Sequence, residues 1–345
     1  MHELTIRKVD LPLFLSALLD QYRVVAPRKV GPADVVFDDY TPGADLLFDY
    51  VNALLPPKFL VFPRRESLFG IQGTRRPTLV PPPPGKPLAL FGLRSCDATG
   101  IRFLERFFGE RGFDDGSVTG RIQQALKMTL ACHTPGPECF CVCCDGGPFL
   151  TSGFDIQFTD LGDRLLAEVA TPRGGAAAET AWSYFAAATA ADLQAKCRQV
   201  ADADHKFTRR SFVADGIKRI SLDRIPEEAW DEWAADCQGC GGCCFVCPTC
   251  SCFTVRDAPV GPGACQRERS WDACLYEGFT REASGHNPRG VRPQRVKRRY
   301  FHKLSMQYMQ LMGRHGCVGC GRCVEVCMGD LDISTLLSRM HDERR

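Results

Sequence analysis

Two stretches of the chain carry the same cysteine pattern, and this pattern is typical of iron–sulfur binding. Both follow a C-x2-C-x2-C-x3-C spacing: Cys237, Cys240, Cys243 and Cys247 with Pro248 next, and Cys317, Cys320, Cys323 and Cys327. Each two-residue gap returns the backbone to the same small volume, so three thiolates on one tight loop can reach three corners of a 4Fe–4S cubane. Intervening glycines leave room for peptide N–H groups to turn toward the sulfides.

The fourth cysteine of each run points away from its own loop, and in two-cluster ferredoxins it binds the other cluster. We therefore expect two 4Fe–4S clusters with exchanged fourth ligands. Cluster one would be held by Cys237, Cys240, Cys243 and Cys327. Cluster two would be held by Cys317, Cys320, Cys323 and Cys247. Zinc fits poorly, because it prefers two C-x2-C pairs from separate turns. Met328 replaces the expected proline after Cys327, but ligation does not need that proline.

The N-terminal half offers a third set of thiols: Cys96, Cys132, Cys139 and Cys141. These cysteines follow predicted strands, where loops from neighbouring strands can converge. Four converging thiolates would suffice for a third 4Fe–4S cluster. Buried packing cysteines and a zinc site are the two alternatives that the sequence leaves open.

Composition supports metal binding over disulfides. The chain has 345 residues, 20 cysteines and a formal net charge of +2. No run of about 18 apolar residues is present, so we expect no membrane span. The N-terminus does not resemble a signal peptide. We therefore expect a cytoplasmic protein, in which thiols bind metal more often than they pair with each other. The low net charge gives no reason to expect nucleic acid as a partner.

The sequence pattern changes near residue 205, which indicates two domains. Residues 1–205 predict a mixed α/β domain, and residues 206–345 predict a helical, ferredoxin-type dicluster domain, with the boundary near 205–230. About seventy residues rich in helix formers separate the two cysteine runs. That separation favours a dicluster domain built from helices over a small sheet. A basic run at 286–303 predicts a face that is solvated or that lies beside a partner or a cluster.

Local patterns predict several elements of the first domain. Residues 13–22 predict a helix and residues 86–93 a strand. A helix should follow over 97–110, with Asp97 or Thr99 as N-cap and Ile101, Leu104 and Phe108 on one face. Residues 154–170 predict a hairpin. Residues 176–200 predict one alanine-rich helix that carries Cys197 as a packing residue. Between the cysteine runs, residues 257–264 predict a Pro/Gly loop.

At this point the sequence resembles the iron–sulfur beta subunits of cytosolic nickel–iron hydrogenases (the sulfhydrogenases), which are similar to the iron–sulfur subunits of anaerobic sulfite reductases. The resemblance rests on motifs in family order from about residue 30 to residue 332, among them FGLRSCDATGI, ACHTPGPECFC, CGGCCFVCPTCSCF, HNPR and CVGCGRC. Relative to the family pattern, Cys143 and Cys144 are additional, so either could replace Cys141 as a ligand or be incidental.

The resemblance implies a non-catalytic subunit that relays electrons. Its partners would be a flavoprotein subunit linked to NAD(P)H or ferredoxin and a catalytic oxidoreductase subunit of the hydrogenase or sulfite-reductase type. The chain itself lacks G-x-G-x-x-G and G-x4-G-K-[ST] motifs, so no nucleotide site is visible. The alternative is a catalytic reductase that uses an N-terminal, site-differentiated cluster. A zinc-stabilised interaction module is the third option. The roles of Cys250, Cys252 and Cys274 stay open.

Overall fold

A mixed eight-stranded sheet forms the core of the N-terminal half. The computed structural model describes residues 2–32, 34–109 and 114–342. The strands lie in the order β10 (Phe185–Ala187), β1 (His2–Arg7), β9 (Arg164–Val169), β8 (Ile156–Asp160), β7 (Leu126–Leu130), β6 (Leu88–Leu93), β2 (Arg23–Val30) and β3 (Asp34–Asp39). The apolar side chains of β6, β7 and β8 are buried, as is expected for strands that are covered on both faces of the sheet.

The central strands β2, β6, β7 and β8 are parallel. Their carboxyl ends therefore meet at one edge of the sheet, which is where loops of α/β proteins commonly build sites. Cys96 follows β6 and Cys132 follows β7 at this edge. The strand predicted over 86–93 and the hairpin predicted over 154–170 are both confirmed, the latter as antiparallel β8 and β9.

The helices of this half are α1 (Leu11–Ala17), α2 (Lys58–Val61), α3 (Ser95–Gly109), α4 (Gly116–Gln124), α5 (Pro172–Glu179) and α6 (Ala190–Ala203). The first predicted helix is confirmed as α1 and a following 3-10 turn. Helix α3 is confirmed with its predicted apolar face buried. Its predicted N-caps are wrong, because the helix begins at Ser95 and Asp97 pairs with Arg322 instead.

The single helix predicted over 176–200 is also wrong. Helix α5 ends at Glu179, and Phe185–Ala187 forms β10, which pairs with β1 at the edge of the sheet. Thr189 then starts α6 with a capping box to Asp192. The pairing of β10 at the sheet edge and the capping box that starts a new helix at Thr189 outweigh the helix propensity of alanine. Cys197 is exposed on α6, so it is not a packing residue.

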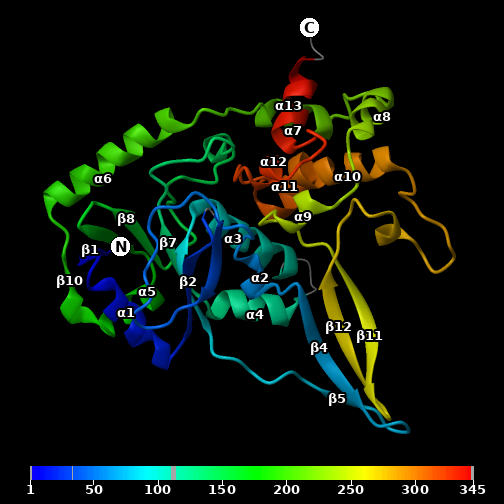
Figure 1. Cartoon of the computed structure of the whole chain (residues 1–345). Coiled ribbons are helices and arrows are strands. Elements are labelled where there is room, and N and C mark those ends of the chain that lie inside the picture. Colours follow the sequence, from blue (N-terminus) through cyan, green and yellow to red (C-terminus); the bar gives the residue numbers. More distant parts are fainter. Residues whose placement is uncertain (1, 33, 110–113, 343–345) are drawn as a thin grey trace.

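The C-terminal half contains α7 (Val213–Ser221), α8 (Glu227–Ala235), α9 (Gly242–Phe245), α10 (Arg292–Leu304), α11 (Met306–Met312), α12 (Arg322–Glu325) and α13 (Ile333–Asp342). Figure 1 shows these helices gathered together, with α6 and the segment after it crossing to them from the large sheet. The expectation of helices is met only in part, because a long hairpin of β11 (Phe253–Gly261) and β12 (Ala264–Trp271) lies between the cysteine runs. The Pro/Gly loop predicted over 257–264 is wrong for most of its length, because β11 continues to Gly261 and β12 begins at Ala264, so that only residues 262–263 form the turn.

The hairpin joins the two halves through a second sheet. Strand β12 pairs with β4 (Arg65–Gln72), which pairs with β5 (Thr78–Val80), so the order is β11-β12-β4-β5. This four-stranded sheet extends away from the other elements (Figure 1). Strands from both sides of residue 205 thus share one sheet, and the domain boundary near 205–230 stays a prediction.

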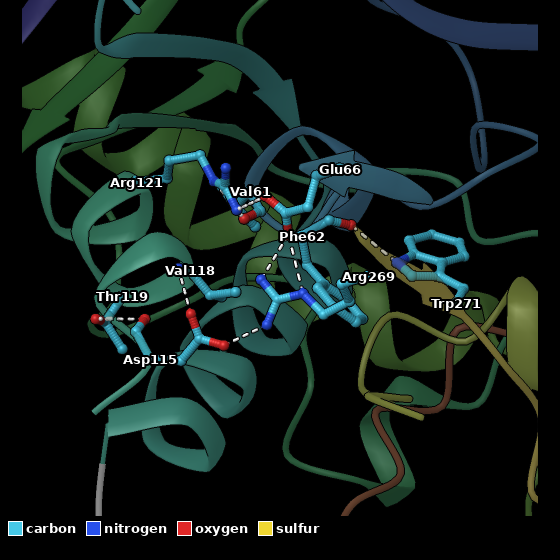
Figure 2. Close-up of polar contacts among 9 residues, drawn as sticks. All are labelled: Val61, Phe62, Glu66, Asp115, Val118, Thr119, Arg121, Arg269 and Trp271. Atoms are coloured by element: carbon cyan, nitrogen blue, oxygen red, sulfur yellow. Dashed lines mark hydrogen bonds and ion pairs between the residues drawn. The ribbon is translucent and has the colours of Figure 1, made fainter. Parts of the chain in front are cut away.

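A buried arginine fastens the base of this sheet. Arg269 on β12 is 1% exposed and donates from Nε to Glu66 at 3.0 Å and from Nη2 to the same carboxylate at 2.5 Å. It also pairs with Asp115, which caps α4, and Arg121 of α4 donates to Glu66 (Figure 2). The indole of Trp271 donates to the carbonyl of Phe62 at 3.0 Å. Two carboxylates around one guanidinium satisfy its buried charge.

Among the described residues, no helix is both long and apolar enough to cross a bilayer.

Candidate iron–sulfur sites

The structure brings the eight cysteines of the two runs together around two separate cavities. One cavity is lined by Cys237, Cys240, Cys243 and Cys327, and we name it cavity one. The other is lined by Cys247, Cys317, Cys320 and Cys323, and we name it cavity two. Each set contains three thiols from one loop and the fourth from the other loop. The fourth cysteines are therefore exchanged between the two loops in space.

Backbone amides point at the sulfurs of both cavities. The N–H of Gly239 lies 3.4 Å from Sγ of Cys237, and that of Gly319 lies 3.4 Å from Sγ of Cys317. The N–H of Leu331 donates to Cys327 at 3.3 Å. Such donors stabilise negative charge on sulfur and help to set the potential of a bound cluster. The residues at both cavities therefore fit a thiolate-bound, negatively charged group.

Helix α10 inserts two buried cations between the cavities. Arg299 lines both cavities and donates from Nε to Sγ of Cys243 at 2.9 Å. A hydrogen bond from Cys244, together with this guanidinium, lowers the pKa of Cys243 to about 5. Lys303 lines cavity two and donates to Thr249 at 2.6 Å. Burial opposes its charge, but Cys247 and Cys250 nevertheless raise the pKa of Lys303. Cysteine thiols are the leading electrostatic neighbours of both cations, which favour the ionised form of sulfur. At Cys247 the thiol of Cys250 and burial outweigh Lys303 and raise the pKa to about 12.

Sequence reasoning missed these cations as individual residues. The basic run at 286–303 was left open as a solvated face or one beside a partner or a cluster. In fact the run divides: Arg292 is exposed and Lys297 half-buried, whereas Arg295, Arg299 and Lys303 are buried. The available signal was the spacing of four between the last three, which places them on one side of a helix.

The second cysteine loop is packed against the N-terminal half. Gly319 has φ +64°, and a Cβ there would lie 2.6 Å from the backbone of Cys141. The N–H of Phe140 donates to the carbonyl of Gly319 at 2.8 Å. Arg322, 2% exposed, forms a two-pronged ion pair with Asp97 at 2.7 and 3.1 Å. A buried pair of this kind depends on both partners.

Pro248 also serves this packing. A Cβ on Gly100 of α3 would lie 2.6 Å from the Pro248 ring, so the helix and the ring are in close contact. The proline fixes the direction in which the chain leaves the first loop, and α3 lies directly against it.

The four N-terminal cysteines also lie near one another. The side-chain amide of Asn52 is 3.9 Å from Sγ of Cys96 and 4.0 Å from Sγ of Cys139. Burial raises the pKa of Cys139 to about 12, and the neighbouring thiol of Cys132 contributes to the increase. Burial likewise raises the pKa of Cys141, with Cys132 and Cys139 as electrostatic neighbours. These thiols come from loops at the carboxyl edge of the large sheet, and Asn52 among them is a residue that sequence reasoning missed.

This N-terminal group lies directly beside cavity two. Cys96 packs with Val318 and Cys320 in one small buried cluster. Asn52 donates to the carbonyl of Cys320 at 2.7 Å. Cavity one, cavity two and the N-terminal group therefore form a connected series, with Arg299 shared at the first step and Cys320 at the second.

The two additional cysteines occupy different surroundings. Cys144 is fully buried, and the neighbouring thiol of Cys317, together with burial, raises the pKa of Cys144. Cys143 is half-buried beside Arg210. Cys144 thus lies beside a cavity-two thiol, whereas the N-terminal group is formed without either residue.

Four further cysteines gather behind the first loop: Cys244, Cys250, Cys252 and Cys274. Sγ of Cys244 is 3.9 Å from Sγ of Cys274. The buried ammonium of Lys58 donates to the carbonyls of Cys244 and Cys250 at 3.4 and 3.0 Å. Cys265 is half-buried on β12, away from these thiols.

In the part of the chain that the structure describes, no three Cys, His, Asp or Glu side chains are arranged to hold a single metal ion. A lone zinc requires sulfur atoms about 2.3 Å from one centre. A cubane differs, because its four thiolates bind four separate iron atoms.

Comparison with known proteins agrees with this geometry. Residues 236–331 match the family model of the 4Fe–4S dicluster domain, which implies two 4Fe–4S clusters. The chain is also 30% identical over 334 residues to sulfhydrogenase 2 subunit beta of Pyrococcus furiosus, and the match covers 96% of each chain.

Proposed function

Since this chain belongs to the sulfhydrogenase beta-subunit family, an iron–sulfur family of hydrogenase complexes, we propose that it relays single electrons between two partner subunits. One partner would be a flavoprotein linked to NAD(P)H or ferredoxin, and the other a catalytic oxidoreductase subunit. The observation that carries this proposal is the connected series of thiol groups from cavity one to the N-terminal group.

We assign cluster one to cavity one and cluster two to cavity two. The ligands are then Cys237, Cys240, Cys243 and Cys327 for the first cluster and Cys317, Cys320, Cys323 and Cys247 for the second. Each cavity contains four thiols, amide donors and a buried cation, as a negatively charged cluster requires. When bound, the clusters supply one-electron redox chemistry.

We assign a third 4Fe–4S cluster to Cys96, Cys132, Cys139 and Cys141. Their shared surroundings at Asn52 and their contact with Cys320 support this assignment. Arg94, which is 4% exposed, lies beside Cys132 and Cys96 and would balance the negative charge.

Cavity one is better placed than cavity two to exchange electrons with a partner. Cys240 is exposed, and the neighbouring Met328 is 79% exposed. Cys317 and Cys320 of cavity two are buried against the N-terminal half. We therefore propose that one partner docks over Cys240 and Met328.

The cluster content is tested by iron analysis of anaerobically purified chain. Three clusters predict about twelve iron atoms per chain and two predict about eight. Cys132→Ser should remove about four of the twelve, whereas the exposed control Cys197→Ser should remove none. Fewer than about six iron atoms in the parent chain contradicts the two-cluster core.

The relay is tested in the complex recovered through a tag on this chain. Cys320→Ser should abolish electron transfer from the flavoprotein to the catalytic subunit. Each half-reaction with an artificial electron carrier should survive, because each partner retains its own cofactors. Turnover of a natural substrate by the chain alone with an artificial electron donor, lost on Cys132→Ser but retained in Cys197→Ser, would instead support a catalytic reductase at the N-terminal cysteines.

A further inference from the structure

The base of the β11–β12 hairpin brings two unassigned cysteines together. Cys252 precedes β11, Cys274 follows β12, and the N–H of Asp272 donates to the carbonyl of Cys252 at 3.0 Å. The Cys274 thiol lowers the pKa of Cys252, so the two thiols are electrostatic neighbours. Both cysteines therefore lie at the same paired end of the hairpin, where closing a disulfide would need little backbone movement.

Both thiols line a pocket of about 320 Å³, a size suited to a small molecule. We name it the thiol pocket. Its aromatic walls come from α3, β11, the segment after β12 and α11: Phe103, Phe107, Phe253, Phe279 and Tyr308. Its remaining wall is the side of α10 that carries the buried cations.

That wall is positively charged and lacks an acidic counterpart. Arg298, Arg299 and Lys303 line the thiol pocket as cations, and its lining contains no Asp or Glu among the residues that the structure describes. Burial lowers the pKa of His302, which also lines the pocket, to about 3, so this side chain is neutral near pH 7. Nε of Arg298 and Nε2 of His302 are buried without a hydrogen-bond partner within those same residues. Buried polar nitrogens are normally paired, so these two indicate a missing partner, and for the guanidinium of Arg298 that partner must be an acceptor. An anionic ligand would supply one.

The thiol pocket adjoins both cluster cavities. Arg299 lines all three spaces. Cys250, also in the pocket lining, is the largest cause of the raised pKa of Cys247 of cavity two. Thr249 lines the pocket as well and contacts Sγ of Cys247 at 3.2 Å. Electrons reaching either cavity are therefore close to the Cys252–Cys274 pair.

We propose that the thiol pocket binds an anionic disulfide with an aromatic or apolar body, and that Cys252 and Cys274 form the dithiol that reduces it. This inference rests on the proposed function only for its electron supply. The thiolate of Cys252 attacks the substrate S–S bond, forming a mixed disulfide and releasing one thiol. Cys274 then attacks Cys252, closing the Cys252–Cys274 disulfide and releasing the second thiol.

The reaction is balanced by two electrons and two protons. Two single electrons from the reduced partner enter by way of the cluster sites and reopen the Cys252–Cys274 disulfide, and water supplies the two protons. The neighbouring Cys274 thiol lowers the pKa of Cys252, which suits Cys252 as the attacking group.

The first test follows the thiols and does not need electron relay. The iron-loaded protein is equilibrated in thiol–disulfide buffers of stepped potential, quenched with an alkylating agent, digested and analysed by mass spectrometry. We expect a reversible link between the Cys252 and Cys274 peptides, absent in Cys252→Ser and retained in Cys265→Ser. Failure to form this link in any buffer overturns the proposal. The proposal is also overturned if metal analysis finds zinc, or iron in excess of the cluster iron, that the Cys252→Ser variant no longer binds.

The second test compares two aromatic disulfide probes, the dianionic dithiobis-nitrobenzoate and the neutral dithiodipyridine. Arg298→Gln should slow modification of Cys252 by the anionic probe about tenfold, the value of one charged hydrogen bond. The neutral probe should be affected less than about twofold. Equal effects on both probes overturn the anionic preference. If the disulfide forms but clusters reduced with dithionite cannot reopen it, the clusters are not the source of its electrons. The proposed relay between partner subunits is tested independently, by the Cys320→Ser variant of the complex.

Discussion

The two cysteine loops have the same spacing but different surroundings. The loop around Cys240 lies at the surface, with that residue exposed and its cavity lined by residues of the C-terminal half. The loop around Cys320 is buried, with Gly319 against Cys141 and Arg322 paired with Asp97. Spacing therefore governs which metal group a loop can hold. Packing governs whether that group faces a partner or the interior of its own chain.

The largest effect should come from the buried ion pair of the second loop. Arg322→Gln leaves Asp97 buried without its counter-ion, which should lower the free energy of unfolding by about 3–5 kcal/mol. The control is Arg339→Gln, which removes a partly exposed pair with Asp236 beside the first loop and should cost about 0–1 kcal/mol. Chemical denaturation of the iron-loaded protein measures both. Similar losses of unfolding free energy in the two variants would show that the buried and the exposed ion pair stabilise their loops equally, which contradicts the comparison.

Equivalent glycines give a sharper version of the comparison. Gly239 and Gly319 each stand two residues after the first cysteine of their run, with φ +67° and +64°. Alanine at either position should cost about 1–2 kcal/mol for the left-handed backbone. Only Gly319→Ala also meets the backbone of Cys141, which should add about 1–3 kcal/mol, whereas the space at Gly239 is open. A difference of less than about 0.5 kcal/mol between the variants would contradict the close packing of the second loop.

The smallest predicted effect concerns redox potential, where the two sites should respond alike. Arg299→Gln removes a positive charge shared by both cavities, so the reduced, more negative clusters lose stabilisation and both potentials should fall. At about 4 Å a unit charge contributes roughly 1–4 kcal/mol, or roughly 40–170 mV for one electron. Potentiometric titration followed by electron paramagnetic resonance measures the shift. A change confined to cluster one would mean that Arg299 acts only through its contact with Cys243.

Much of the N-terminal fold could be predicted, because its signals are local. The hairpin of β8 and β9 and the amphipathic face of α3 are confirmed. The errors occur where a distant strand decides the outcome. Phe185–Ala187 lies in an alanine-rich segment but pairs with β1, and the Pro/Gly stretch after Cys252 becomes a strand because β4 extends the hairpin. The intrinsic preferences of neighbouring residues carry no information about which distant strand a segment will pair with.

The sequence by itself determined the chelating units of this protein, because three thiols within seven residues are close together in any compact loop. It also indicated the exchanged fourth ligands, since that spacing directs the last cysteine outward. Only the tertiary structure decided which cations stand between the cavities and that Asn52 lies among the N-terminal thiols. It alone placed Cys252 and Cys274 at the same end of a hairpin and in the lining of one pocket. These contacts link residues far apart in the chain, so they depend on how the whole chain packs.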